Sequence, residues 1–363
     1  MRNGGLLHKL NRNSGVSWSP IPKPPPPGRE RLYGVHSVRA ALDVAAKALQ
    51  QQDTRAHTTG SVAPRRVFAL FVRDFRKSLS PPASHGLTDS GGDPHFPFLP
   101  TSSYLFLHDV CRRAGTLGVP INPVERNELT YLCGERRNQN VVLETTVFRE
   151  KTIDLRASSS MDASRIGEGQ TNLMSFPTLH PHETCLVLDK VIDPMNVGNI
   201  LRTAYFFGVR SVILSSDCAS CTPVVARAST GYLEYISIYR AGTALKEILG
   251  HAAARNPAVR IVGTVARSHF EELSTTRVKT SLTVAEQPVV GSHPRSGPTL
   301  VLMGNEDKGL TADLLKLCTH LVHVPACGET DEERDGRSLN VNSACAVVLA
   351  HLSGQTPLII PKQ

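Results

Sequence analysis

The 363-residue chain has few aromatic residues and no long apolar segment. Phe, Tyr and Trp make up only 5% of the residues, so the core must consist mainly of aliphatic side chains, as in many α/β proteins. No apolar run approaches the roughly 20 residues that a membrane-spanning helix requires. The sequence therefore predicts a soluble protein without a membrane partner.

Acidic residues are absent from the first 29 positions, whereas basic residues are frequent there: Arg2, Lys9, Arg12, Lys23 and Arg29. The segment is also rich in Ser and Asn and lacks the apolar stretch of a secretory signal. These properties are typical of an organelle transit peptide, and we expect residues 1–29 to direct the protein to the mitochondrion. Another organelle or the cytoplasm is the alternative, with the segment serving as a disordered basic tail that ends in a proline run.

The cysteines show neither a disulfide framework nor a zinc-binding pattern. Of the eight, only Cys218 and Cys221 form a close pair. A structural zinc site needs a second pair of ligands, and the nearest candidates, His320 and His323, lie where a helix end should run into a buried strand. We therefore expect no metal site, and reduced, apolar thiols instead.

Negative charge is in deficit over the whole chain. There are 40 Lys and Arg residues against 32 Asp and Glu residues, which gives a formal net charge of +8 and a pI near 9.2. This balance favours a polyanionic partner such as a nucleic acid over a membrane.

The length predicts two domains. Residues 30–150 should form a small α/β domain, because compact apolar runs alternate there with segments of helical periodicity. Ser78–Thr101 is typical of a long surface insertion, and residues 151–182, rich in Ser, Gly, Asp and Thr, of a linker. The expected elements are a helix from residue 35, a strand at 67–72, a helix at 104–114, and strands at 119–124 and 141–145.

Residues 183–355 alternate continuous apolar strands with helices, and residues 356–363 form a tail. Strands without polar alternation indicate a parallel sheet that is buried on both faces. A helix should run from Asn199 to Phe207, just past Gly198, and another from Ala344 to His351. The expected strands are 185–189, 212–214, 236–239, 259–263, 299–303 and 321–324.

Three polar motifs lie in this half, each between an expected strand and an expected helix: residues 193–204 (DPMNVGNILRTA), 302–310 (LMGNEDKGL) and 338–344 (SLNVNSA). Asn, Arg, Glu or Ser at a strand end can face a ligand. The spacing of Asn196 and Arg202 would let a loop amide and a helical guanidinium converge on one phosphate or hydroxyl. Alternatively, Asn196 caps the helix and Arg202 forms a surface ion pair.

In this order the motifs resemble those of the SpoU family of RNA ribose 2′-O-methyltransferases, over roughly residues 183–352. The resemblance implies a SPOUT-type parallel sheet with a C-terminal trefoil knot, preceded by a small ribosomal-protein-like α/β domain that binds the substrate. It also implies S-adenosyl-L-methionine as cofactor, RNA rather than DNA as partner, and a homodimer.

The resemblance assigns roles to individual residues. The catalytic group would comprise Asn196, Arg202, Glu306, Ser338 and Asn340. Backbone groups of three further residues would hold the adenine and ribose of S-adenosylmethionine: Gly304, Val324 and Leu339. In the family the matching arginine is proposed to assist deprotonation of the ribose hydroxyl. A guanidinium gives up a proton only with difficulty, so electrostatic positioning by Arg202 stays open as the alternative.

Several positions depart from the family pattern. Asn138-Gln139-Asn140 stands where relatives usually have His-Gln-Gly, although Asn140 can adopt a left-handed turn. Residues 326–337 form an insertion with five acidic residues, and Asn342 replaces a usual Ser. Thr222–Gly231 resembles a segment of the rRNA-guanosine branch, in which Arg227 could meet RNA phosphate or simply be solvated. For Arg112, Arg113, Arg136 and Arg137, phosphate binding and solubility are equally plausible.

Within the family, the layout most resembles the branch that methylates a guanosine ribose in mitochondrial large-subunit rRNA. The sequence-based prediction is therefore ribose 2′-O-methylation of organellar large-subunit rRNA. The alternatives are a tRNA ribose 2′-O-methyltransferase and a non-catalytic rRNA-binding assembly factor that keeps the fold. A metal-dependent nucleotide enzyme would need a ligand cluster that the sequence does not show.

Overall fold

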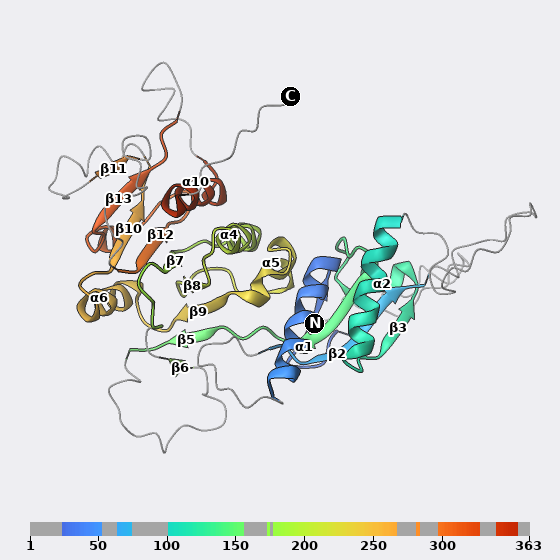
Figure 1. Cartoon of the computed structure of the whole chain (residues 1–363). Coiled ribbons are helices and arrows are strands. Elements are labelled where there is room, and N and C mark those ends of the chain that lie inside the picture. The colour runs from blue at the N-terminus through green and yellow to red at the C-terminus, as the bar shows by residue number, and fades with distance from the viewer. Residues whose placement is uncertain are drawn as a thin grey trace, which may run out of the picture.

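The computed structural model describes residues 24–52, 64–74, 101–155, 173–174, 177–266, 281–283, 297–326 and 339–354. Its strands form two sheets, which lie side by side along the long dimension of the molecule (Figure 1). Residues 1–23 of the leader, the 78–101 insertion before Thr101 and most of the acidic insertion lie outside the described residues.

The N-terminal sheet has four strands in the order β1-β4-β2-β3. Strand β4 pairs antiparallel with β1 and β2, whereas β2 and β3 are parallel. Alternate residues of β4 face opposite sides, so Leu143 packs in the main core and Val142 against α3. The five predicted elements are confirmed as α1 (Val35–Gln52), β2 (Val67–Arg73), α2 (Thr101–Thr116), β3 (Ile121–Val124) and β4 (Val141–Thr146), whereas β1 (Arg29–Tyr33) and α3 (Arg126–Leu132) were not predicted.

The Asn138–Asn140 turn holds the start of α1. Gln139 and Asn140 both have positive φ, 54° and 66°, which confirms the left-handed turn expected at Asn140. The Gln139 side-chain oxygen accepts a hydrogen bond from the Val35 N–H at 3.1 Å, and the Asn138 carbonyl accepts one from Gly34. This motif therefore satisfies backbone N–H groups at the beginning of α1.

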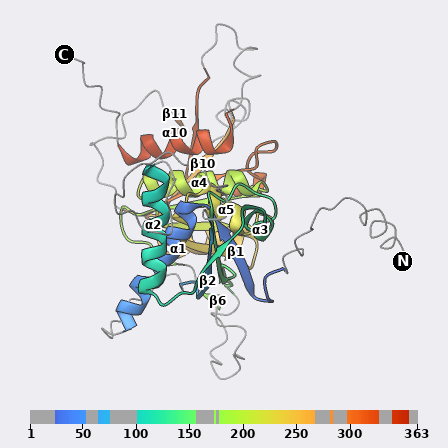
Figure 2. The same ribbon diagram turned by 90° about the vertical axis from the view of Figure 1, so that its right-hand side faces the viewer.

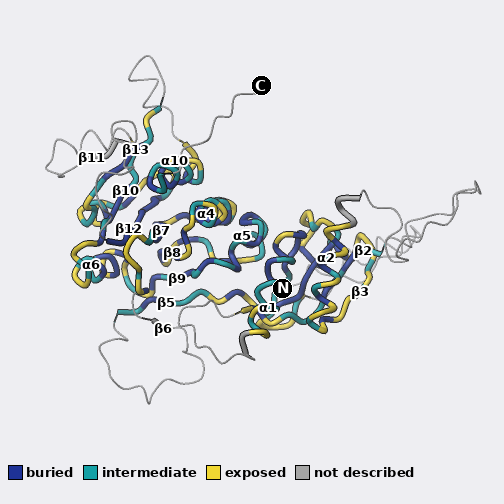
Figure 3. Tube along the Cα trace, viewed as in Figure 1, coloured by how far each residue is buried: buried dark blue, intermediate teal, exposed yellow. Residues whose placement is uncertain are grey.

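The second sheet has nine strands in the order β11-β13-β10-β12-β7-β8-β9-β5-β6, and all of its pairs are parallel. The central strands β12, β7 and β8 are buried throughout or nearly so (Figure 3), which confirms the predicted sheet with two covered faces. The strand bounds are β5 (Lys151–Ile153), β6 (Leu173–Met174), β7 (Thr184–Leu188), β8 (Ser211–Leu214), β9 (Ser237–Ala241), β10 (Arg260–Thr264), β11 (Ser281–Thr283), β12 (Thr299–Met303) and β13 (His320–His323).

Helices cover this sheet on both faces. Helix α10 packs on α4 on one side (Figure 2), and α6 packs with α8 on the other. The bounds are α4 (Pro194–Phe206), α5 (Pro223–Ala228), the 3₁₀ helix η3 (Tyr232–Tyr235), α6 (Leu245–Arg255), α8 (Ala312–Leu315) and α10 (Val341–Ser353). In the part of the chain that the structure describes, no helix is both long and apolar enough to span a membrane.

Two stretches differ from the sequence-based expectation. The region 151–182, expected to be a linker, contains β5 and β6, and β5 extends the second sheet by pairing with β9. Helix α4 begins at Pro194 rather than at Asn199, because Asp193 and Pro194 start it and Gly198 is accommodated inside it. A Cβ on Gly198 would lie 2.4 Å from the Ala228 Cβ, so glycine allows α4 and α5 to pack closely.

The two domains make direct contact through α1, α5 and η3. The Ser37 hydroxyl donates to the Ala226 carbonyl at 3.0 Å. Gly231 has a φ of 85°, and a Cβ there would lie 2.6 Å from the Ala40 Cβ. A small residue with left-handed backbone is thus required where η3 meets α1.

A buried ion pair crosses the same contact. The Arg65 Nε donates to the Glu234 carboxylate at 2.8 Å, and another guanidinium nitrogen binds Glu30 and the Thr146 carbonyl. The Arg65 side chain is only 2% exposed, and Glu234 is buried as well. Burial and the two carboxylates act on Arg65 in opposite directions, and the net effect raises the pKa of its guanidinium.

Candidate active site

The N-terminus of α4 forms one wall of the candidate site, at the carboxyl end of β7. Asp193 caps the helix by accepting a hydrogen bond from the Met195 N–H at 2.9 Å, and Pro194 occupies its first turn. Asn196 therefore lies in the first helical turn rather than in a loop as expected. Since Asp193 provides the cap, the alternative role of Asn196 as the helix cap is excluded.

Asn196 joins the three motifs. Its Nδ2 donates to the Glu306 carboxylate, and its Oδ1 accepts a hydrogen bond from the Asn340 Nδ2 at 3.1 Å. The Asn340 Oδ1 in turn caps α10 by accepting from the Asn342 N–H at 2.9 Å. Each amide keeps one N–H, and Glu306 keeps one oxygen, for a further partner. Glu306 and Asn340 thus both hold the Asn196 side chain in place.

The loop after β12 carries Glu306 in a tight turn. The Asn305 Oδ1 accepts hydrogen bonds from the Asp307 and Lys308 N–H groups, while its Nδ2 donates to the Lys190 carbonyl at 3.0 Å. A Cβ on Gly304 would lie 2.3 Å from the Gly309 carbonyl carbon, so the turn itself requires glycine there. The loops after β7 and β12 are thereby joined.

Helix α10 is fixed to α4 by a side-chain contact that the sequence did not predict. The Thr203 hydroxyl donates to the Asn342 Oδ1 at 2.9 Å. A serine, usual at this position in relatives, has a shorter side chain than Asn342. Asn342 in place of Ser therefore helps to hold α10 against α4. This role could not be inferred from the sequence, because it depends on which helices pack together.

Arg202 lies on α4 apart from the Asn196 network. Six residues of helix separate the two side chains by roughly 9 Å along the axis and place them about 120° apart around it. Arg202 is exposed and makes no ion pair with any described acidic residue, so the alternative of a surface ion pair finds no support in the described part of the chain. Its charge acts instead on His36 of α1, which lies in the N-terminal domain. The convergence expected for Asn196 and Arg202 is not seen within one chain.

A buried carboxylate, Asp189, directly follows strand β7 at this edge of the sheet. Burial raises the pKa of Asp189, although Lys190 and a hydrogen bond from the Thr311 backbone oppose the effect. The side chain's Oδ2 has no hydrogen-bond partner among the described residues. In the sequence, Asp189 is a charged residue directly after an apolar run, which predicted the end of a strand but not a buried carboxylate.

The remaining predicted site residues follow β13 and precede α10. Val324 is half-buried and packs against the core, whereas Leu339 is exposed just before Asn340. Ser338 lies outside the described residues. In the described residues no group of three or more His, Cys, Asp or Glu side chains could hold a metal ion.

Most of the arginines considered for RNA contact in the N-terminal domain have protein partners. Arg112 and Arg113 both bind Asp109, at 2.8 Å each, and Arg113 also binds Asp43. Arg136 donates to the Tyr33 hydroxyl at 3.1 Å. Their charges are therefore partly used within the domain.

Comparison with known proteins supports the assignment of the second domain. Residues 183–350 match the model of the SpoU rRNA Methylase family. The chain is 27% identical over 244 residues to an "Uncharacterized tRNA/rRNA methyltransferase" of Mycobacterium ulcerans, covering 67% of this chain and 64% of that protein. It is 24% identical to human "rRNA methyltransferase 1, mitochondrial", covering 68% of this chain and 62% of that protein.

The match thus spans less than two thirds of these two relatives. A longer match, 25% identical over 325 residues, covers 89% of this chain and 95% of the "23S rRNA (guanosine-2'-O-)-methyltransferase RlmB" of Coxiella burnetii. Among solved structures, the SpoU methyltransferase AviRb of Streptomyces viridochromogenes has the same fold, with a TM-score of 0.54 at 18% identity over 90% of each chain. Together with the three motifs, now brought to one edge of a parallel sheet, these matches show that residues 183–350 form a SpoU methylase domain.

Proposed function

We propose that this protein transfers the methyl group of S-adenosylmethionine to the 2′-hydroxyl of a ribose in organellar large-subunit rRNA, with a guanosine as the target. The observation that carries the proposal is the hydrogen-bonded chain Glu306–Asn196–Asn340, which links all three SpoU motifs. Relatives named mitochondrial rRNA methyltransferase 1 in yeast and human support the organelle and the rRNA, and the relative named RlmB supports guanosine.

The residues at this edge fit S-adenosylmethionine. Leu339 is an exposed apolar side chain beside a polar network, and Val324 lies half-buried at the end of β13. Apolar surface next to backbone and amide groups suits an adenine face and a ribose. We propose that Gly304, Val324 and Leu339 hold the cofactor through their backbone groups. When bound, it supplies the electrophilic methyl group.

The chain's own residues orient the nucleophile. Because Glu306 and Asn340 fix both ends of the Asn196 amide, its remaining N–H has a defined direction toward a ribose or phosphate oxygen. Arg202, exposed and without an acidic partner among the described residues, does not converge with Asn196 within one chain, and we propose that it supplies positive charge to the RNA beside the reacting ribose. We propose that Ser338 joins this group.

The architecture carries further proposals. We propose a homodimer in which a second copy covers α4 and α10, because both helices expose large apolar side chains: Met195, Phe206 and Val347. Phe206 is 74% exposed, an unfavourable state for a phenyl ring in water. We also propose that the SpoU domain has a C-terminal trefoil knot, that residues 30–150 bind the substrate, and that residues 1–29 are a transit peptide.

Ribose-methylation mapping of organellar and cytosolic rRNA and tRNA tests the function, in cells with and without the protein. We expect one 2′-O-methyl mark in organellar large-subunit rRNA to disappear and to return with the wild type. Arg202→Ala should fail to restore it, while Arg255→Ala, an exposed arginine on the distant α6, should succeed. If instead a tRNA mark is lost without the protein and restored by it, the substrate is tRNA and not rRNA. Unchanged marks together with rescue of growth by Arg202→Ala would favour an assembly factor.

A further inference from the structure

The surface beside Arg202 is formed by both domains. Helix α5 lies between α4 and α1 (Figure 1), and the start of α1 is held on the end of α5 by the Ser37–Ala226 hydrogen bond of 3.0 Å. His36 is exposed at this start of α1. The first turn of α1 and the helices of the SpoU domain thus share one face.

Arg227 lies across the joint between the domains. Its side chain packs on Gly34, where a Cβ would lie 2.7 Å from the Arg227 Cδ and Nε atoms. Gly34 has a φ of 89°, so glycine serves both the backbone and the arginine. Arg227 makes no ion pair with any acidic side chain in the described part of the chain. A half-buried guanidinium without a carboxylate is available to an anion.

The charges around His36 are mainly positive. Partial burial, followed by Arg227, Arg39 and Arg202, lowers the pKa of His36, so arginine charges from α5, α1 and α4 all act on one imidazole. Arg39 binds Asp109 at 3.4 Å, and Asp109 also binds Arg112 and Arg113. Asp43 is the other carboxylate of this network, in which three arginines bind two aspartates. Arg202 and Arg227 add two further positive charges that act on His36.

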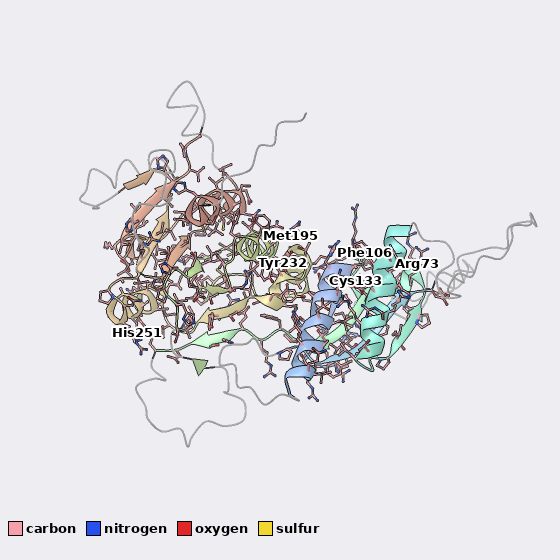
Figure 4. The ribbon with its side chains drawn as sticks, viewed as in Figure 1. Arg73, Phe106, Cys133, Met195, Tyr232 and His251 are labelled. Carbon is pink, nitrogen blue, oxygen red and sulfur yellow. The ribbon has the colours of Figure 1, made fainter. Side chains whose placement is uncertain are left out.

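An open hollow with two apolar and two charged residues in its lining adjoins these charges. It has a volume of about 320 Å³ and is lined by Arg39, Leu105, Phe106 and Asp109. Phe106 is 41% exposed, and its ring meets the His36 ring edge-on with centroids 5.7 Å apart. Figure 4 shows Phe106 between α2 and the start of α1, on the same side of the molecule as Met195 of α4.

We propose that this inter-domain surface binds a single-stranded RNA nucleotide next to the methylated one, with its base on Phe106 and its phosphate between Arg227 and Arg202. The inference rests on the proposed function and adds a binding site to it. An exposed aromatic face beside unpaired arginines is the combination that single-stranded RNA uses, because bases stack on rings and phosphates need cations.

Fluorescence anisotropy with a labelled, mixed-sequence RNA 12-mer tests the site in the full-length protein. Phe106→Ala should weaken binding about tenfold, and Phe106→Trp should restore it. The matched control is Tyr131→Ala, because Tyr131 is 42% exposed in the same domain but lies on α3. Figure 2 shows α3 and α2 on different sides of the N-terminal sheet. Equal affinities for the Phe106→Ala and Tyr131→Ala variants would overturn the proposal.

The salt dependence tests the phosphate contact separately. Arg227→Ala should reduce the slope of log affinity against log salt by about 0.7, the value for one phosphate contact on a single strand. Arg255→Ala should leave the slope unchanged, and an unchanged slope for Arg227→Ala would count against the site.

Methyl transfer separates this inference from the proposed function. Transfer by the wild type with no effect of Phe106→Ala or Arg227→Ala on RNA affinity would overturn the site alone. RNA binding that depends on both residues, with no methyl transfer by the wild type to any RNA, would support the site and refute the proposed function.

Discussion

The contact between the two domains has two unlike sides. On one, Arg65 binds Glu234 and Glu30 and is shielded from water, and Arg240 nearby binds Glu150 of the connecting segment at 2.6 Å. On the other, Arg202 and Arg227 have no acidic partner among the described residues. Arginine thus serves two purposes at this contact. The paired arginines fix the two domains relative to each other, and the unpaired arginines remain available to an anion.

Breaking the paired side at Arg65 should have the largest effect. Arg65→Ala leaves Glu234 buried without its cation, and we expect a loss of about 3–5 kcal/mol in the free energy of unfolding, measured by urea titration. Arg66→Ala, at an exposed neighbouring arginine, is the control and should change stability by less than about 0.5 kcal/mol. Equal stability of the two variants would show that the buried pair does not hold the domains.

The second paired arginine gives a pH-dependent prediction. Burial alone would raise the pKa of Glu150, but hydrogen bonds and charge from Arg240 outweigh it and lower the pKa below the ordinary 4.5. On acidification the unfolded state therefore takes up the proton first, so the stabilisation is full above about pH 4.5 and is lost as pH falls through the lowered pKa.

Glu150→Gln should cost about 3 kcal/mol at pH 7, and its stability should approach that of the wild type as pH falls through the lowered pKa of Glu150. Urea titrations of the variant and the wild type from pH 7 down into the acidic range measure this difference in stability, with Glu247→Gln at an exposed glutamate as the control. A difference that stays constant with pH would contradict the role assigned to Glu150.

On the unpaired side, Arg202→Ala should separate activity from stability. Because Arg202 makes no ion pair with the described residues, its removal should alter the free energy of unfolding by less than about 0.5 kcal/mol. Methyl transfer from labelled S-adenosylmethionine should fall at least about a hundredfold at saturating RNA. A large loss of stability instead would place Arg202 with the structural arginines.

Gly231→Ala tests how closely the two sides are coupled. The new Cβ would strain a φ of 85° and meet Ala40 and the His36 carbonyl, so we expect a loss of about 2 kcal/mol. Displacement of α1 should also weaken RNA binding, because His36 of α1 packs against the Phe106 ring proposed to stack on the base. Thermal unfolding and anisotropy measure the two effects, with Gly250→Ala on α6 as a control, since a Cβ there meets nothing within 4 Å. Lower stability with unchanged RNA affinity would show that the two sides are independent.

Some positions in the site were predictable only in part. The resemblance put Asn196, Glu306 and Asn340 in one catalytic group, and the structure places these three side chains in contact. The helical position of Asn196 was predicted wrongly, since Gly198 was taken as a boundary although it is a packing position. The burial of Asp189 was not predicted, because an Asp after an apolar run has the same sequence pattern whether its carboxylate is exposed or buried.

The sequence by itself determined the alternation of elements and the order of the three motifs, because apolar periodicity and local turn chemistry depend on neighbouring residues. Only the tertiary structure decided which arginines are paired. Arg65 meets Glu234 across 169 positions, and Arg240 meets Glu150 across 90, and no local pattern specifies such partners. It also brought Phe106 against His36 and His36 within reach of the charges of Arg227 and Arg202. The packing of α1 on α5 and η3 depends on Gly34 and Gly231 at the contact.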